Sequence, residues 1–469
     1  MLSGILILIL SYIVYKLWLS YYYDKLNHIA GPWYSKYTNI IETYHRLCGK
    51  QFYYYMKLHE IYGPMVRVAP NRISFINSEA VQEIYQSYKY AKGPIYQIFT
   101  PFGDNLFSSG DRQFHQKRKK LLQNTFNNKS VLSMETMVHE RGVLKLLEKM
   151  QNSKEKQCNL YQQIHLLTFD IIAELTFNKE FNTLEKLDDP IIHWLKSITI
   201  YAVLDGIFGI YRFIEPKCKR NLKEFILGCI SDTKKENIKE GNTILTHFIN
   251  ARDDNGVGLT DQQLLAECLT QLIAGSDTTC NSIIWTIYLI LKSPDAYKKI
   301  QSEIDKNFKS VDDVNYLDCK NKLVYMEAVI QEAMRLFPVS SGLLARTVPP
   351  GGVSINDTFI PENVEIGTCF YVYHRTNQFK NPEEFIPERW LNEEGILNRG
   401  KSLPFLIGPR ACIGRELGWM EMYLIITSLF LTFDMQLDKS KDIEKLMQPE
   451  YFLVLRPKYS DLPIIFNKR

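Results

Sequence analysis

The feature that most constrains this chain is the stretch PFLIGPRACIGRELGWM at residues 404–420, in which a single cysteine, Cys412, lies between glycines and arginines. Gly408 and Gly414 allow the backbone to approach a bound group closely, and the amide groups at the start of a following helix favour an anion such as a thiolate. Arg410 can pair with carboxylates that a bound group carries, and Phe405 can pack beside the sulfur and limit the access of water.

Two uses of such a cysteine can be compared. A cysteine that catalyses acyl transfer requires a histidine base, and none of the nine histidines lies near Cys412 in the sequence, so this use has no support. A thiolate that ligates a metal requires backbone room around the sulfur and donors that stabilise its charge. Because the stretch offers one thiolate together with a cation for carboxylates, we expect haem rather than zinc.

The composition narrows the remaining classes of protein. The nine cysteines form no C-x-x-C pair, which argues against a zinc site or a disulfide framework and favours a reducing compartment. A formal charge of +4 over 469 residues is too small for a typical nucleic-acid-binding protein. No linker divides the chain, so we expect one large catalytic domain over residues 28–469 and a short segment before it.

The N-terminal residues 1–27 are predicted to form that segment, a membrane anchor. Apolar and aromatic residues continue from Leu2 to Tyr23, interrupted by Lys16, which can extend its charge to the membrane surface. A cleaved signal peptide is the alternative, but no basic region precedes the run and no A-x-A-like site follows it. Since Lys16, Lys25 and Lys36 all lie on the C-terminal side, we expect the main domain to face the cytoplasm.

Periodicity predicts a chain that is mainly α-helical. The segment YGPMVRVAPNRISFIN, residues 62–77, has the pattern of two strands around a turn at Pro70-Asn71, which predicts a small sheet near the start. Most of the remainder has helical period, including one long run from Asp261 to Lys292.

The segment FLIGPRACIG, residues 405–414, matches F-x-x-G-x-R-x-C-x-G, the haem-binding loop of the cytochrome P-450 monooxygenases. The chain resembles fungal microsomal members of this family from AGPW at residues 30–33 through to this loop. The resemblance implies a triangular, mainly α fold with a small β-rich lobe and haem b held between two long helices. It also implies that Cys412 is the axial ligand of the iron. A structural cysteine in a glycine-rich loop is the alternative.

Two further segments match the family in order and spacing. EAMR and PERW resemble its Glu-Arg-Arg network, here Glu332, Arg335 and Arg389, which holds the fold together on the haem side. AGSDTT, residues 274–279, resembles its acid–alcohol pair, which assigns proton delivery to Asp277 and Thr278. By itself AGSDTT favours a kinked helix whose hydroxyl groups bond back to carbonyl oxygens, and the Cys412 motif is what favours proton delivery instead.

The family's propionate-binding residues are only partly recognisable. His115 stands where the family usually has tryptophan, and Lys119 takes the place of an arginine, or Arg118 does if the register shifts by one. A plain solvated basic face explains HQKRKK equally well. Arg346 matches another propionate-binding arginine.

The substrate is expected to be apolar. Candidate pocket residues are Phe99, Phe102 and Phe107 in the expected substrate loop, Leu343 opposite them, and Leu272 and Ala274 over the iron.

The resemblance implies a monooxygenase that inserts one atom of dioxygen into a hydrophobic small molecule. Electrons would come from NADPH through a flavoprotein reductase, with cytochrome b5 as a second donor, at the endoplasmic reticulum membrane. Residues 117–120 and Arg415 would form a basic surface for the reductase. The alternatives are a reductase-independent haem-thiolate isomerase or dehydratase and a non-catalytic haem sensor.

Overall fold

The computed structural model describes residues 11, 15, 24–187, 189–208, 216–235 and 243–469. The anchor predicted for residues 1–27 therefore lies outside the described part, except for residues 11, 15 and 24–27. Among the described helices, none is both long enough and apolar enough to span a bilayer.

The chain is mainly helical, as predicted. Its helices are α2 (Ile40–Leu47), α3 (Gln51–Tyr62), α4 (Ser78–Tyr85), α5 (Arg112–Leu122), α6 (Asn128–Thr136), α7 (Leu144–Asn152), α8 (Leu160–Phe177), α9 (Thr183–Lys186), α10 (Pro190–Phe208), α11 (Lys217–Lys235), α12 (Ile244–Asn250), α13 (Asp261–Lys292), α14 (Pro294–Asn307), α15 (Tyr316–Lys322), α16 (Val324–Leu336), α17 (Phe370–Tyr373), α18 (Asn392–Lys401), α19 (Arg415–Thr432) and α20 (Ile443–Leu446).

The strands form small sheets. They are β1 (Met65–Ala69), β2 (Arg72–Phe75), β3 (Ala91–Lys92), β4 (Gln157–Asn159), β5 (Arg346–Thr347), β6 (Val353–Ile355), β7 (Thr358–Ile360), β8 (Glu365–Gly367), β9 (Phe433–Leu437), β10 (Pro449–Tyr451), β11 (Leu455–Pro457) and β12 (Pro463–Lys468). The largest sheet has the order β1-β2-β8-β5-β3, and the others are β6-β7, β10-β11 and β4-β12-β9.

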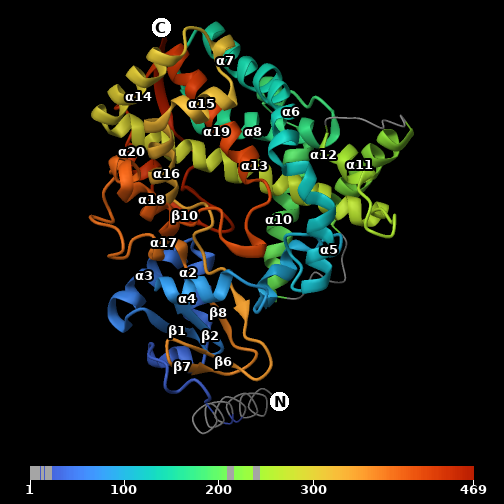
Figure 1. The fold of residues 1–469 in the computed structure, drawn as a ribbon, viewed down its shortest axis with the longest axis vertical. Helices are drawn as coiled ribbons and strands as arrows, with labels where there is room; N and C mark the ends of the chain where they lie inside the picture. The colour runs from blue at the N-terminus through green and yellow to red at the C-terminus, as the bar shows by residue number, and fades with distance from the viewer. Residues whose placement is uncertain (1–10, 12–14, 16–23, 188, 209–215, 236–242) are drawn as a thin grey trace, which may run out of the picture.

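The predicted pair of strands near the start is confirmed. β1 and β2 are antiparallel around the turn at Pro70-Asn71, and β2 then pairs in parallel with β8 from much later in the chain. Figure 1 shows these N-terminal strands, in blue, beside the orange β6 and β8 in the smaller lobe, while the larger lobe above them is helical.

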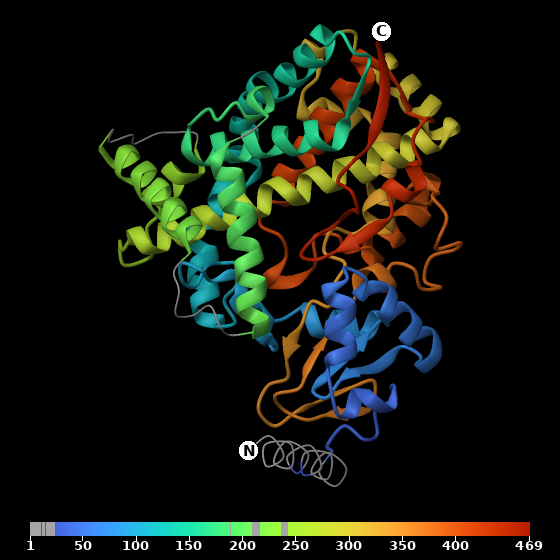
Figure 2. The same cartoon turned by 180° about the vertical axis from the view of Figure 1, so that it is seen from behind.

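Helix α13 is the predicted long helix, with the predicted bounds. Thr260 and Gln263 form a reciprocal capping box at its start, and Ser293 ends it while capping α14, which begins with Pro294. In Figure 2 this helix, in yellow, crosses the middle of the larger lobe. The helix continues through AGSDTT, where Ser276 Oγ and Thr278 Oγ1 donate to the carbonyl oxygens of Leu272 and Ala274 at 3.0 and 2.5 Å.

Gly275 has a packing role in this turn. A Cβ atom at this position would lie 2.5 Å from Cγ1 of Ile172 on α8, which is buried. The missing side chain therefore lets α8 approach α13 closely beside AGSDTT.

Replacing Gly275 by alanine is expected to lower the free energy of unfolding by about 1–3 kcal/mol, because Ile172 or the helix must move. The same change at Gly228 in α11 is the control, since a Cβ there meets nothing within 4 Å. It should be neutral or stabilise by up to about 1 kcal/mol through helix propensity. Denaturant unfolding measures both, and equal effects at the two positions would contradict this packing role.

Candidate functional site

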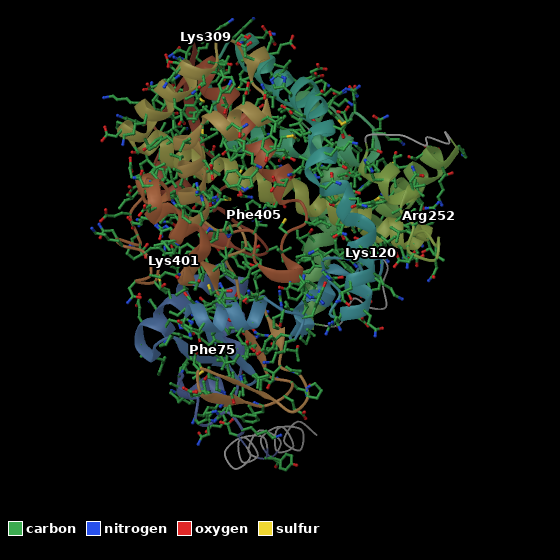
Figure 3. The ribbon with its side chains drawn as sticks, viewed as in Figure 1. Phe75, Lys120, Arg252, Lys309, Lys401 and Phe405 are labelled. Atoms are coloured by element: carbon green, nitrogen blue, oxygen red, sulfur yellow. The ribbon has the colours of Figure 1, made fainter. Side chains whose placement is uncertain are left out.

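The loop that carries Cys412 is closed by its own backbone. The Cys412 amide donates to the Phe405 carbonyl oxygen at 2.9 Å, and Phe405 lies near the centre of the molecule (Figure 3). Gly408 has a φ of 72°, and a Cβ there would lie 2.3 Å from the carbonyl oxygen of Tyr85 on α4. Gly408 is therefore needed for the turn and for contact with α4, while a Cβ at Gly414 would meet no protein atom within 4 Å.

The thiol of Cys412 is closely surrounded by protein and yet accessible. Burial raises the pKa of this thiol, and the Gly414 amide and the charge of Arg415 partly oppose the rise. Its side chain is nevertheless exposed. The thiol is accessible, and the space next to Gly414 is open. Both features suit a cysteine that serves as the ligand of a bound group.

Two cations from distant segments, Lys92 and Arg346, lie close to Arg410 of this loop. Lys92 on β3 and Arg346 on β5 are directly opposite in the antiparallel ladder. Arg410 donates to the carbonyl oxygens of Ser109 and Gly110 at 2.7 and 3.3 Å. Burial and the neighbouring Arg346 lower the pKa of Arg410 to about 10, and burial with both arginines lowers the pKa of Lys92 well below its ordinary value.

Helix α5 adds His115 and Lys119 to the same cluster. Lys119 Nζ donates to the Pro409 carbonyl oxygen at 2.8 Å, and His115 Nδ1 lies 2.8 Å from the Tyr88 hydroxyl. Burial, and then the charge of Arg410, lower the pKa of His115 to about 3, so its imidazole is neutral near pH 7. Arg118 points elsewhere, since it forms a buried ion pair with Glu267 of α13 at 3.0 Å.

This cation cluster (Lys92, Lys119, Arg346 and Arg410) fits a bound dicarboxylate. In the described part of the chain, no carboxylate forms an ion pair with any of its four members, and Arg410 Nε has no hydrogen-bond partner. Like charges held together in a partly buried region are costly unless an anion joins them. The cluster therefore has the chemistry to bind the two carboxylates of haem.

Three consecutive residues of α13, Asp277, Thr278 and Thr279, direct their side chains to different neighbours. Asp277 Oδ1 lies 2.9 Å from Nε2 of His165 on α8. Thr278 is partly exposed on the same side as Ala274, to whose carbonyl oxygen it donates. Thr279 bonds to the buried Glu421 of α19, whose pKa burial raises to about 8.

The predicted pocket residues belong to different packing clusters. The rings of Phe99 and Phe107 pack at 5.1 Å, whereas Phe102 is buried in the main core. Leu343 is partly buried and packs against a separate core cluster beside β1. Leu272 is fully buried in the main core, because a residue two positions before Ala274 lies on nearly the opposite side of the helix.

Glu332, Arg335 and Arg389 form a buried network. The Glu332 carboxylate accepts from Arg335 Nε and Nη2, Arg389 Nε, Trp390 Nε1 and the Ile386 amide, all at 2.8–2.9 Å. The side chains of Glu332 and Arg335 are fully buried. The network joins α16 to the segment that precedes the Cys412 loop.

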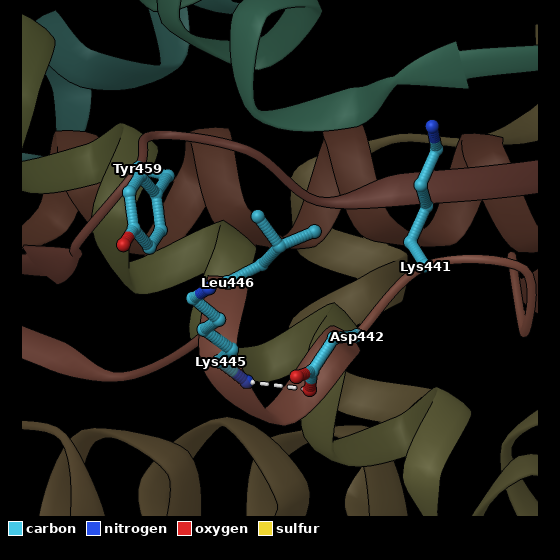
Figure 4. Close-up of a pocket in the computed structure, with 5 residues that line it drawn as sticks. All are labelled: Lys441, Asp442, Lys445, Leu446 and Tyr459. Atoms are coloured by element: carbon cyan, nitrogen blue, oxygen red, sulfur yellow. Dashed lines mark hydrogen bonds between the residues drawn. The ribbon is translucent and has the colours of Figure 1, made fainter.

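The pocket in Figure 4 is a different kind of feature. It is lined by Lys441, Asp442, Lys445, Leu446 and Tyr459. Its marked hydrogen bond runs from the Lys445 amide to Asp442 Oδ1, which caps the four-residue helix α20. This contact stabilises a helix end and indicates no chemistry.

Three residues at the site were not predicted from the sequence: Lys92, His165 and Glu421. Lys92 is recognisable only through its pairing with Arg346 across two short strands. His165 and Glu421 lie on helices whose apolar pattern gives no sign that they contact α13.

Comparison with known proteins gives consistent matches along the chain. The model of the family described as cytochrome P-450 matches residues 32–463. The cytochrome P-450 monooxygenase traB of Penicillium crustosum is 28% identical over 93% of this chain and 91% of its own length. The monooxygenase aba2 of Botryotinia fuckeliana is 28% identical over 89% and 84%, and astA of Talaromyces wortmannii is 27% identical over 95% and 94%.

Replacing Glu332 by glutamine is expected to lower the free energy of unfolding by about 3–5 kcal/mol, because two buried guanidinium groups lose their counter-charge. Glu327→Gln on the same helix is the control, since its pair with Arg399 is at the surface and should be worth less than about 1 kcal/mol. Denaturant unfolding distinguishes them, and equal losses would show that the network contributes no more than a surface pair.

Proposed function

The chain belongs to the cytochrome P-450 family and is a haem-thiolate monooxygenase; from this premise we propose that it hydroxylates a hydrophobic small molecule with electrons that a separate flavoprotein reductase takes from NADPH. The observation that carries the proposal is the accessible thiol of Cys412 beside a cation cluster that has no carboxylate partner among the described residues. The thiol can ligate a metal, and the cations can bind two carboxylates. Haem supplies both the metal and the two carboxylates.

The residues that would hold haem b can be named. Cys412 Sγ would ligate the iron as a thiolate, because a metal-bound thiol is deprotonated, and the Gly414 amide and Arg415 would stabilise its charge. Lys92, Lys119, Arg346 and Arg410 would bind the carboxylates, and neutral His115 would donate a hydrogen bond in place of the family's tryptophan. Bound haem supplies the activation of dioxygen.

Asp277 and Thr278 would deliver protons for this reaction. The Thr278 hydroxyl is bonded to the Ala274 carbonyl oxygen and would have to turn from it to pass on a proton. The Asp277 carboxyl group would then replace that proton at Thr278 Oγ1. The exposure of Ala274 and Thr278 along one side of α13 supports their placement next to the substrate.

The proposed location is the endoplasmic reticulum membrane, with an anchor at residues 1–27 and the catalytic domain in the cytoplasm. The proposed partners are the reductase and cytochrome b5. The basic surface for them is smaller than the sequence suggested, because Arg118 is buried and Lys120 pairs with Asp254. Exposed Lys117 would remain for an acidic partner, whereas Arg415 pairs with Glu416 at 3.3 Å.

Replacing Cys412 by serine is expected to abolish the absorption band that carbon monoxide gives with reduced thiolate-bound haem. Cys369→Ser and Cys48→Ser should leave this band unchanged, because one thiol is buried beside Ser341 and the other lies at the end of α2. Loss of the band in either control, with its retention in Cys412→Ser, would overturn the ligand assignment.

The reaction itself is tested with a substrate chosen by spectral titration of a panel of apolar compounds. With reductase and NADPH, Thr278→Ala and Asp277→Asn should lower the ratio of product to NADPH by roughly tenfold or more and raise hydrogen peroxide, because proton supply fails. Haem content should not change. Product formation without NADPH or reductase would contradict the proposed monooxygenase cycle.

A further inference from the structure

The acid of the proposed proton-delivering pair is held by a histidine on another helix. Asp277 Oδ1 lies 2.9 Å from His165 Nε2, while the neighbouring Thr278 hydroxyl points to the Ala274 carbonyl oxygen. The exposed fractions of the side chains are 46% for Asp277 and 20% for His165. The pair is therefore in contact with solvent, and Asp277 directly precedes Thr278 in the helix.

The packing of α8 against α13 fixes this contact. Gly275 admits Ile172 of α8, and His165 lies seven residues, or about two turns, before Ile172 and so on the same face of α8. The ring of Tyr161 stacks on the His165 ring, with centroids 6.1 Å apart and planes within 13°. His165 is thus held against Asp277 by two neighbouring helices rather than meeting it by chance at the surface.

We propose that His165 is a positioning residue that orients the Asp277 carboxylate and returns a proton to it in each cycle. This inference rests on the proposed role of Asp277 and Thr278 in proton delivery. When the Asp277 carboxyl group gives its proton to Thr278, the carboxylate takes the Nε2 proton of His165. The imidazole, left neutral, then takes one proton from water, so one proton enters for each one delivered.

The other titratable and charged groups beside the pair are Tyr161 on α8, Cys280 on α13 and Arg456 on β11. Burial, and then nearby negative charge, raise the pKa of both Tyr161 and Cys280. Histidine is the side-chain type that changes charge between pH 5 and 8. His165 is also the group that contacts the Asp277 carboxylate directly, at 2.9 Å.

His165→Gln and His165→Phe test the proposal. Glutamine can still donate a hydrogen bond to Asp277 but cannot carry a proton, whereas phenylalanine keeps a ring and loses the donor. In the wild type, the ratio of product to NADPH should fall as pH rises from 6 to 8. His165→Gln should lose this pH dependence, and His165→Phe should also have a lower ratio at every pH.

A readout without turnover uses carbon monoxide as the probe. The infrared band of carbon monoxide on the reduced enzyme should change with pH in the wild type and in Tyr161→Phe, which keeps the stacked ring. The change should be absent in His165→Gln and Asp277→Asn. Because Tyr161→Phe leaves His165 and Asp277 intact, it controls for a general effect of substitution on α8.

The failures of the two proposals can be told apart. If Asp277→Asn and Thr278→Ala leave the ratio of product to NADPH unchanged, the proton-delivering pair itself is wrong. If Asp277→Asn lowers the ratio but His165→Gln keeps the wild-type pH profile and infrared change, the role of His165 is overturned. His165→Gln should add nothing in an Asp277→Asn background, and a further loss there would also overturn it.

Discussion

The mutual repulsion of Lys92, Arg346 and Arg410 is the constraint around which the site is built. The cation cluster combines Lys92 and Arg346 from two strands, Lys119 from helix α5 and Arg410 from the Cys412 loop. In the described part of the chain, no carboxylate forms an ion pair with any of them. Such an arrangement costs free energy in the empty protein and is relieved by a dianion. Cofactor binding and folding are therefore linked, because a group that binds only the folded state stabilises it.

The buried Glu332 network fixes the position of the loop that bears Cys412. Arg335 Nη1 donates to the His374 carbonyl oxygen, and the Leu403 amide donates to His374 Nε2 at 3.0 Å. Burial lowers the pKa of His374 to about 3, so its ring stays neutral and can accept this bond. A continuous set of hydrogen bonds thus runs from Glu332 to the start of the Cys412 loop, and the network acts on the site through the backbone.

Features that depend on local sequence were predictable, and those that depend on packing between distant elements were not. The bounds of α13 follow from a capping residue, a long helical pattern and Pro294, all close in sequence. The sequence could not show whether Arg118 or Lys119 lies at the Cys412 loop, because this depends on contacts between distant elements. Arg118 pairs with the buried Glu267, whereas Lys119 donates to the Pro409 carbonyl oxygen of the loop. The role of Gly275 likewise becomes clear only from α8, whose approach no local pattern reveals.

The turn at AGSDTT shows how one helix can serve packing and chemistry together. The regular helix separates neighbouring side chains by about 100°, so Asp277, Thr278 and Thr279 must face three different directions. Thr279 bonds to Glu421 and joins α13 to α19, which follows the Cys412 loop, while Asp277 joins α13 to α8. The Thr278 hydroxyl, by contrast, bonds back to the Ala274 carbonyl oxygen of its own helix. Two neighbours are thereby fixed by the fold, and the hydroxyl between them keeps the freedom to turn that the proposed proton delivery would require.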